Sequence, residues 1–322
     1  MLEPLKLTIQ KSGRLFNQTA DILKKCSFHL EYVDRSFRHV FKDFPLEILL
    51  VRDDDIPSLV HRGACDVGIV GLNEVKEFAA SFTDFTESNQ PEQNCQQTQG
   101  HRLHYECHLG FSRCRLSLAV PVEAEYHDLK WFSQKKIATS YPACLEEFMA
   151  KQGVEIQVVP ISGSVETMPA MGVADGICDL VATGSSLVQH KLKEVATVFH
   201  SEAVMVSARE QLDPEKLKLL DLFCGRVKGV LKAQSSKYVM MNAPRVKLNR
   251  IMKLIPGLRK PTVMPLYSGE LTFSDIHELK NTDDYVAVHA VATEPVFWST
   301  IEALKNLGAS SILVVPIEKI ID

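Results

Sequence analysis

Short apolar runs alternate with segments of helical spacing from residue 5 to residue 206, and this alternation restricts the chain to folds built on a largely parallel sheet. Leu5–Ile9, Leu46–Val51 and Asp66–Gly71 are predicted strands. Helical spacing extends from Leu15 to Cys26 and from Ile56 to His61. Parallel strands need crossover connections of this kind, so these segments indicate one α/β unit.

A second α/β unit is predicted for residues 116–194. Apolar runs at 196–199 and 203–206 and a helix at 214–224 are expected to return the chain to the first unit. Residues 80–112 are polar and irregular, and a long loop or insertion is expected there. The strands of the second unit are expected near Cys114–Val120, Lys135–Thr139, Glu155–Val159 and Gly176–Val181, with a helix from Ala143 to Gln152.

Residues 225–322 follow a different order. Strand and helix patterns succeed one another as βαββαβ, from a strand at Lys237–Met241 to a strand at Ile312–Pro316, which is typical of a ferredoxin-like domain. The expected fold class is α/β, with two periplasmic-binding-protein-like α/β domains around a cleft and a C-terminal ferredoxin-like domain. The expected domains are residues 1–115 with 195–224, residues 116–194, and residues 225–322.

The stretch from Asp179 to Leu187 joins the end of an apolar strand to a small, hydroxyl-rich turn at the start of a helical segment. Such a turn presents free backbone N–H groups and the positive end of the helix dipole, which suits a phosphate. Asp179 is placed to receive hydroxyls of a sugar that carries this phosphate. An ordinary helix cap is the alternative interpretation, because Ser and Thr are favoured there. The turn consists of Thr183, Gly184, Ser185 and Ser186.

Polar clusters lie just past the carboxyl ends of the predicted strands, where open α/β sheets bind ligands. Lys11, Arg14 and Arg52 would face the phosphate turn across a cleft, which predicts a polyanionic substrate. Helix capping by Asp54 and Asp55, and a solvated surface charge for each arginine, are the alternatives. The clusters are Lys11–Arg14, Arg52–Asp55, Gly71–Glu74, Ser140–Pro142, Ser162–Glu166 and Thr183–Ser186.

The chain resembles, over nearly its whole length, the long-form ATP phosphoribosyltransferases that open histidine biosynthesis. Three departures from the family pattern stand out: Ser186 replaces a usual Thr, Leu72 a usual Glu, and Asn242 a common His. Residues 80–112 are also unlike the family. The matching segments are Leu7–Leu15, Val51–Pro57, Cys114–Ala119, Ile137–Pro142, Gly163–Glu166, Ala174–Val181 and Leu307–Lys319.

The resemblance implies transfer of the phosphoribosyl group of phosphoribosyl pyrophosphate to N1 of ATP, with Mg²⁺ on the pyrophosphate. It implies that Thr183, Gly184, Ser185 and Ser186 hold the 5′-phosphate, and that Asp179, Asp175 and Glu166 receive ribose hydroxyls or the metal. The remaining substrate-binding and catalytic residues that it implies are Lys11, Arg14, Arg52, Asp53 and Arg115 for ATP and pyrophosphate, and Tyr141 for the adenine or ribose pocket.

The resemblance also implies that the C-terminal domain binds the inhibitor histidine and that the chain forms a homo-hexamer in equilibrium with a dimer. A core position is the alternative for Met241. The expected effector contacts are Met241, Asn242, Ala309, Ser310 and Ser311.

The formal net charge of -4 and a pI of about 6.3 argue against a nucleic-acid binder. No apolar run approaches membrane-spanning length, no signal peptide is visible, and the scattered cysteines fit a reduced, cytoplasmic protein. The His and Cys residues in and next to the insertion at 80–112 have two interpretations: they bind zinc, or they are ordinary residues of a polar loop. Those residues are Cys95, His101, His104, Cys107, His108 and Cys114.

Three other functions remain open on the sequence. A solute-binding protein would also have two α/β units around a cleft. Such a protein needs no phosphate turn, and this interpretation leaves the family resemblance unexplained. A catalytically silent regulatory subunit would retain the fold, although Arg52–Asp53 and Asp179–Ser186 argue against it. A phosphoribosyltransferase for another nucleobase would share the same motif chemistry.

Overall fold

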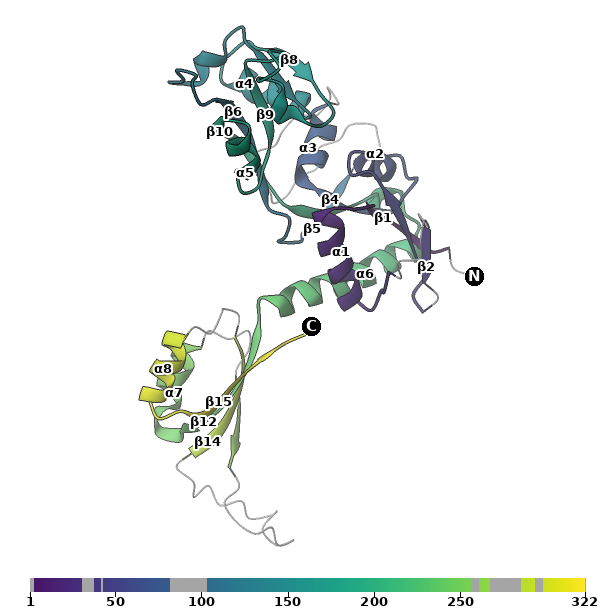
Figure 1. Ribbon diagram of the computed structural model, residues 1–322. Coiled ribbons are helices and arrows are strands. Elements are labelled where there is room, and N and C mark those ends of the chain that lie inside the picture. Colours follow the sequence, from purple (N-terminus) through teal and green to yellow (C-terminus); the bar gives the residue numbers. More distant parts are fainter. Residues whose placement is uncertain are drawn as a thin grey trace, which may run out of the picture. The chain divides into compact units, whose positions relative to one another are not determined.

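The computed structural model describes residues 3–30, 38–41, 43–81, 103–255, 261–266, 285–292 and 298–321. The chain divides into two compact units, Met1–Cys224 and Gly225–Asp322. Both units combine helices with sheets, so the α/β class expected from the sequence is confirmed (Figure 1).

The first lobe of unit one is a six-stranded sheet in which β1, β3 and β4 run parallel. Its central strands are apolar and buried, since helices cover parallel sheets. The helices are α1 (Arg14–Lys25), α2 (Ile56–His61) and α3 (Leu72–Ala80). The strand order is β2 (Arg38–Phe41), β3 (Leu46–Val51), β1 (Leu5–Gln10), β4 (Val67–Gly71), β11 (Ala203–Ser207) and β5 (His104–His108).

The second lobe is a five-stranded sheet in which only β6 runs against the other strands. The carboxyl ends of β7, β8, β9 and β10 therefore share one edge with the first residues of β6; we call this the cleft edge. The helices are α4 (Pro142–Lys151) and α5 (Ser185–Gln189), with 3₁₀ turns η1 (Leu129–Phe132) and η2 (Val165–Thr167). The strand order is β10 (Leu192–Ser201), β6 (Cys114–Pro121), β9 (Gly176–Val181), β7 (Lys136–Thr139) and β8 (Gln157–Pro160).

Two segments connect the lobes: Leu109–Arg113, between β5 and β6, and Glu202, between β10 and β11. The carboxylate of Glu202 pairs with His108 at 2.9 Å and with Arg113 at 3.4 Å, so it ties the two connections together. The expected return to the first lobe at residue 195 is wrong. The chain stays in the second lobe to Ser201, because β10 pairs with the whole of β6.

The expectation of one long loop over residues 80–112 also needs correction. Residues 104–108 form β5, an edge strand paired with β11. Glu106 on β5 is buried, and its carboxylate receives hydrogen bonds from the guanidinium of Arg209 and the hydroxyl of Ser207. Residues 82–102 lie outside the described part of the chain.

Helix α6 (Pro214–Gln234) contains the boundary between the two units and follows η3 (Arg209–Gln211). We expected it to end at residue 224, but Val227, Val230 and Ala233 extend its buried stripe. A Cβ at position 229 would lie 2.6 Å from the carbonyl oxygen of Ile320, which explains the glycine there. The backbone N–H of Ile320 donates a hydrogen bond to the carbonyl of Gly229.

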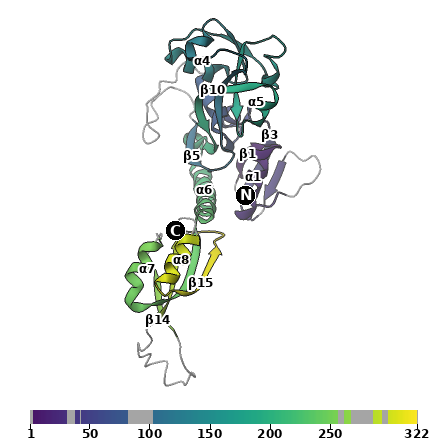
Figure 2. The same ribbon diagram turned by 60° about the vertical axis from the view of Figure 1, so that its left-hand side comes forward.

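The predicted βαββαβ order of unit two is confirmed. Its sheet is antiparallel, and α7 and α8 cover the same face (Figures 1 and 2). The 3₁₀ turn η4 (Arg245–Lys247) precedes α7. The elements are β12 (Lys237–Pro244), α7 (Leu248–Leu254), β13 (Thr262–Pro265), β14 (Tyr285–Ala292), α8 (Trp298–Asn306) and β15 (Ser310–Pro316), in the sheet order β13-β14-β12-β15.

Candidate functional site

The hydroxyl-rich turn after β9 lies on the cleft edge and is open to solvent. Thr183, Ser185 and Ser186 are exposed, and the hydroxyls of Thr183 and Ser185 lie 3.0 Å apart. Gly184 has a φ of +83°, and an added Cβ would meet no described atom within 4 Å. This left-handed residue lets the chain turn directly from β9 into α5, with the hydroxyls facing outward.

Asp179 lies near the end of β9, four residues before Thr183, the first residue of this turn. Its carboxylate accepts a 2.7 Å hydrogen bond from the backbone N–H of Leu180. Burial raises the pKa of Asp179 to about 6, and the negative charge of Glu166 in η2 adds to the rise. The two carboxylates thus lie close enough to interact, and both favour a partner that carries hydroxyls or positive charge.

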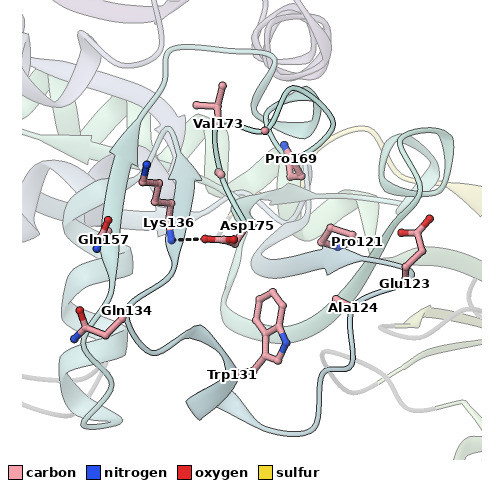
Figure 3. A pocket seen from close by; sticks show the side chains of 12 residues that line it. Pro121, Glu123, Ala124, Trp131, Gln134, Lys136, Gln157, Pro169, Val173 and Asp175 are labelled. Atoms are coloured by element: carbon pink, nitrogen blue, oxygen red, sulfur yellow. Dashed lines mark hydrogen bonds between the residues drawn. The ribbon is translucent and has the colours of Figure 1, made fainter.

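The structure does not bring Asp175 to this place. Asp175 precedes β9, and its carboxylate accepts the backbone N–H of Lys136 at 2.9 Å, at the opposite edge of the sheet (Figure 3). It lines a separate hollow of about 780 Å³ together with Trp131 and Gln157. The strand between Asp175 and the turn rises by about 3.3 Å per residue, so the two lie a full strand length apart.

Arg115, on β6, is committed to a protein partner. Two of its guanidinium nitrogens bind the carboxylate of Glu194 on β10, and a third lies 3.4 Å from the carbonyl of Ala182, directly before the turn. The hydrogen bonds from Arg115 lower the pKa of Glu194. Arg115 therefore supports the strand end that carries the turn.

The basic side chains of the first lobe lie past the ends of β1 and β3. Lys11 and Arg14 are exposed, and their side chains make no hydrogen bond or ion pair to any described residue; the backbone N–H of Lys11 donates to the carbonyl of Val51 at 2.9 Å. Arg52 pairs with Asp54 at 3.2 Å, and Asp53 accepts a 3.1 Å hydrogen bond from the amide of Gln10. Asp55 occupies the N-cap position of α2 without a side-chain capping bond. Lys11 and Arg14 thus remain available to an anionic ligand.

Tyr141 joins the two lobes. Its side chain is buried, and its hydroxyl donates a 2.8 Å hydrogen bond to Glu74 of α3. The amide of Asn73 donates to Glu74 at 2.8 Å and to the Tyr141 hydroxyl at 3.1 Å. The hydroxyl of Ser201 donates to Asn73 at 2.8 Å and accepts from its backbone N–H at 3.0 Å. We call Asn73, Glu74, Tyr141 and Ser201 the interlobe cluster.

A second carboxylate of α3 reaches the same helix of the other lobe. Glu77 accepts hydrogen bonds of 2.9 Å from the backbone N–H groups of Ala143 and Cys144, at the start of α4. This contact caps a helix of the second lobe from the first. Glu77 lies one helical turn after Glu74, so one face of α3 provides both contacts.

Sequence reasoning identified the Gly71–Glu74 cluster but gave it no role, and it missed Glu77 and Ser201. The available signal was the place of Asn73 and Glu74 directly after β4. Burial raises the pKa of Glu74 to about 7, with smaller contributions from the charges of Asp53 and Asp54. The position of Asp53 beside this cluster brings the site residues of the first lobe to the interlobe contact.

The oxygen donors of Asp53, Asp179 and Glu166 suit a hard cation such as Mg²⁺, which keeps several waters and takes one or two carboxylates. Within the described residues, no three His, Cys, Asp or Glu side chains are grouped to hold a metal. His104, Cys107, His108 and Cys114 therefore form no such group, and Cys95 and His101 lie outside the described residues.

The expected effector residues of unit two divide into two sets. Met241 and Ala309 are 2% and 6% exposed and belong to the apolar core, which leaves them no surface for a ligand. Asn242 and Ser310 are paired across β12 and β15, and Ser311 is exposed with a φ of +50°.

Comparison with known proteins gives consistent results. The family model for ATP phosphoribosyltransferase matches residues 52–229, and the model for the C-terminal domain of HisG matches residues 233–319. The ATP phosphoribosyltransferase of Bacteroides fragilis is 41% identical over 317 residues, covering 98% of this chain and 99% of the relative. That of Parabacteroides distasonis is 40% identical over the same shares of both chains.

Among solved structures, a chain of the ATP phosphoribosyl transferase (HisG:HisZ) complex from Thermotoga maritima has a TM-score of 0.55 and 24% identity. The match covers 70% of this chain and 96% of that one, and it supports the fold. Within the described residues, no helix has the length and apolar character to cross a membrane.

Proposed function

Because this chain belongs to the ATP phosphoribosyltransferase family, whose members are transferases of histidine biosynthesis, we propose that it joins the phosphoribosyl group of phosphoribosyl pyrophosphate to N1 of ATP. One observation carries the proposal beyond the family. The phosphate turn and Asp179 share the cleft edge with Tyr141, whose hydroxyl is bound to Glu74 of the other lobe, and the charge of Asp53 acts on Glu74. This arrangement supports a substrate site shared by the two lobes.

The second lobe binds phosphoribosyl pyrophosphate. Thr183, Gly184, Ser185 and Ser186 offer hydroxyls and backbone N–H groups to the 5′-phosphate. The half-buried Asp179, with Glu166 beside it, receives the ribose hydroxyls. Arg115 keeps this edge in place through Glu194 and Ala182.

The first lobe binds the polyphosphate groups. Lys11 and Arg14 are exposed and available, and Arg52 is held only by an exposed pair with Asp54, which an anionic ligand displaces at low cost. Asp53 is held in place by Gln10 and faces the interlobe cluster. This distribution of positive charge supports a polyanion-binding half-site in the first lobe.

In the reaction, the N1 lone pair of the adenine ring forms a bond to the anomeric carbon. The bond from that carbon to the pyrophosphate oxygen breaks, and its electron pair leaves with pyrophosphate. Positioning the two substrates and excluding water supply much of the rate, and no general base is needed because N1 carries no proton. Mg²⁺, held by the pyrophosphate with carboxylates such as Asp53 and Asp179, would neutralise the charge of the leaving group.

We further propose that histidine inhibits the enzyme from unit two, through Asn242, Ser310 and Ser311, and that the chain forms a homo-hexamer in equilibrium with a dimer. The pairing of Asn242 with Ser310 next to the exposed Ser311 supports these contacts. We place the enzyme in the cytoplasm, where ATP is abundant. The free thiols of Cys65, Cys114, Cys144 and Cys178 fit that compartment.

The test is product formation by the purified chain with ATP, phosphoribosyl pyrophosphate and Mg²⁺, followed by mass spectrometry, with pyrophosphatase to remove pyrophosphate. We expect phosphoribosyl-ATP only when both substrates are present, and less of it when histidine is added. Binding of both substrates without product would indicate a silent regulatory subunit. Product with another nucleobase in place of ATP would redirect the proposal to that base.

A further inference from the structure

The interlobe cluster forms a largely buried polar contact between the two lobes of unit one. Asn73 is 6%, Tyr141 7% and Ser201 5% exposed, so their hydrogen bonds are made away from water. Opening the lobes would leave each of these groups without its protein partner until water reached it. A buried polar group without a hydrogen-bond partner is costly, so such a contact is either fully formed or fully broken.

Glu74 is the acceptor at the centre of the cluster. One of its oxygens, Oε1, receives both the hydroxyl of Tyr141 and the amide of Asn73. The neighbouring charges are mostly negative: Asp53 and Asp54 come from the loop after β3, and Glu77 from the next turn of α3. Two cations lie on this side: Arg14 acts with Glu74 on the thiol of Cys114, and the ammonium of Lys76 on α3 lies 4.6 Å from the ring centre of Phe199 on β10.

Within the described residues, no cation of the second lobe is among the charges that act most on Glu74. Tyr141, the N-cap residue of α4, touches Glu74, and the charge that Tyr141 faces from β9 is the carboxylate of Asp179. An ionised Glu74 is therefore held in a partly buried contact among carboxylates. A neutral Glu74 with its proton on Oε2 keeps Oε1 as the acceptor for both donors, without that repulsion.

We propose that Glu74 and Tyr141 form a latch between the lobes, which closes with uptake of a proton by Glu74 and sets the two half-sites face to face. The proposal rests on the proposed function, because the half-sites are those for ATP and phosphoribosyl pyrophosphate. Burial in the closed contact raises the pKa of Glu74 to about 7. Closure is thus favoured in acid, becomes less favourable as the pH rises from about 4.5 to about 7, and changes no further above about pH 7.

Glu74 and Tyr141 act in this scheme as positioning residues. A substrate that binds across the cleft binds only the closed form, so its apparent affinity falls with the fraction of closed molecules. The rate at saturation is measured on molecules that are already closed. A weaker latch therefore raises KM and changes kcat little.

The test compares Glu74→Gln, Tyr141→Phe and the wild type. Gln keeps Oε1 as an acceptor and cannot ionise, whereas Phe keeps the ring and removes the hydroxyl that crosses the lobes. Glu147→Gln is the matched control, because Glu147 lies on α4 and pairs with Lys151 at the surface of that helix. KM and kcat are measured for both substrates from about pH 5 to about pH 9.

We expect Tyr141→Phe to raise both KM values by about tenfold near pH 7, since one buried hydrogen bond is lost. For ATP, the wild type and Glu147→Gln should show KM values that rise as the pH rises to about 7 and level off above it, while those of Glu74→Gln stay low and flat. A fall in kcat with unchanged KM for Tyr141→Phe would overturn the latch and place Tyr141 in the chemical step. Equal pH profiles for Glu74→Gln and the wild type would also overturn it.

Amide hydrogen exchange of the segment 141–151 tests the latch without substrates. After correction for the intrinsic effect of pH, exchange at the start of α4 should quicken in the wild type as the pH rises to about 7 and level off above it, quicken at every pH in Tyr141→Phe, and stay slow in Glu74→Gln. If the purified chain forms no product but exchange follows this pattern, the proposed function fails and the latch stands. Identical exchange in all four proteins would refute the latch alone.

Discussion

The guanidinium of Arg115 on β6 is bound through two nitrogens to the carboxylate of Glu194 on β10. The two strands are neighbours and antiparallel, and the pair lies at the edge where β9 ends. A third nitrogen of Arg115 reaches the carbonyl of Ala182 at 3.4 Å. Arg115 thus connects the β6–β10 pair to the residue directly before the phosphate turn and helps to fix the position of that turn.

Arg115→Lys keeps the positive charge but loses the forked contact. We expect a loss of about 1 kcal/mol in the free energy of unfolding at neutral pH and a severalfold higher KM for phosphoribosyl pyrophosphate. Arg115 lowers the pKa of Glu194, so the stabilisation is present above the usual glutamate pKa and is lost as the pH falls through the lower folded value. Urea unfolding at neutral and at acid pH measures this.

Arg113→Lys is the control for that change, because Arg113 pairs with Glu202 from a side chain that is 77% exposed. It should leave stability nearly unchanged at both pH values. A stability difference for Arg115→Lys that persists undiminished in acid would show that the pair with Glu194 is not its cause.

Glu77→Ala tests the cap that one lobe provides for a helix of the other. The backbone N–H groups of Ala143 and Cys144 would lose their acceptor, at a cost of about 1–2 kcal/mol in the free energy of unfolding. Thermal unfolding of the variant, compared with the surface control Glu147→Ala, measures the loss. Equal midpoints for the two variants would mean that water caps α4 as well as Glu77 does.

The sequence predicted well those elements whose side chains face an apolar core. β1, β3, β4 and β9 follow from continuous apolar runs, and each was expected within a residue or two of its observed bounds. β5 escaped prediction because it is short and its His-Tyr-Glu-Cys-His alternation is inverted: Tyr105 is exposed, whereas the side chain of Glu106 is buried. Its buried face is instead the ion pair of Glu106 with Arg209, whose partners lie about a hundred residues apart in the chain.

The site was predicted as a set of clusters at strand ends but not as a set of contacts. The position of Tyr141 after β7 was readable, whereas its partner Glu74 comes from a helix 67 positions earlier. Asp175 shows the opposite error. It is four positions from Asp179 in sequence, but the strand between them puts it at the other edge of the sheet.

Asn242→Ala tests the proposed inhibitor contact in unit two. Histidine should inhibit the variant at a concentration about tenfold higher than the wild type, while uninhibited activity stays unchanged. Met241→Leu is the control, since Met241 lies in the core and a change of similar volume costs little. Unaltered histidine inhibition in Asn242→Ala would remove that residue from the effector site.

Gly184→Ala tests the left-handed turn that shapes the phosphate site. Alanine meets no described atom there, but a φ of +83° costs an L-residue about 1–2 kcal/mol. Gly153→Ala is the matched control, with a φ of +67° and equally open surroundings. Both variants should lose similar stability, and only Gly184→Ala should raise the KM for phosphoribosyl pyrophosphate. A raised KM in both would assign the effect to general destabilisation.

Asp179→Asn should weaken binding of phosphoribosyl pyrophosphate and strengthen the fold. The amide keeps the shape of the side chain but loses the charge that receives ribose hydroxyls, so we expect KM to rise by at least about tenfold. In the wild type the same KM should rise as the pH falls through about 6, because burial raises the pKa of Asp179 to about 6. Steady-state kinetics at fixed Mg²⁺ measures both effects.

The stability of Asp179→Asn separates this explanation from a plain packing defect. The folded protein binds a proton at Asp179 more tightly than the unfolded chain does, so the ionised carboxylate costs stability above about pH 6 and nothing below about pH 4. The variant should therefore be more stable than the wild type by about 1–3 kcal/mol at pH 8, and the gain should vanish in acid. A variant less stable at every pH would show that Asp179 supports the fold, and its kinetic defect would then say nothing about the ribose.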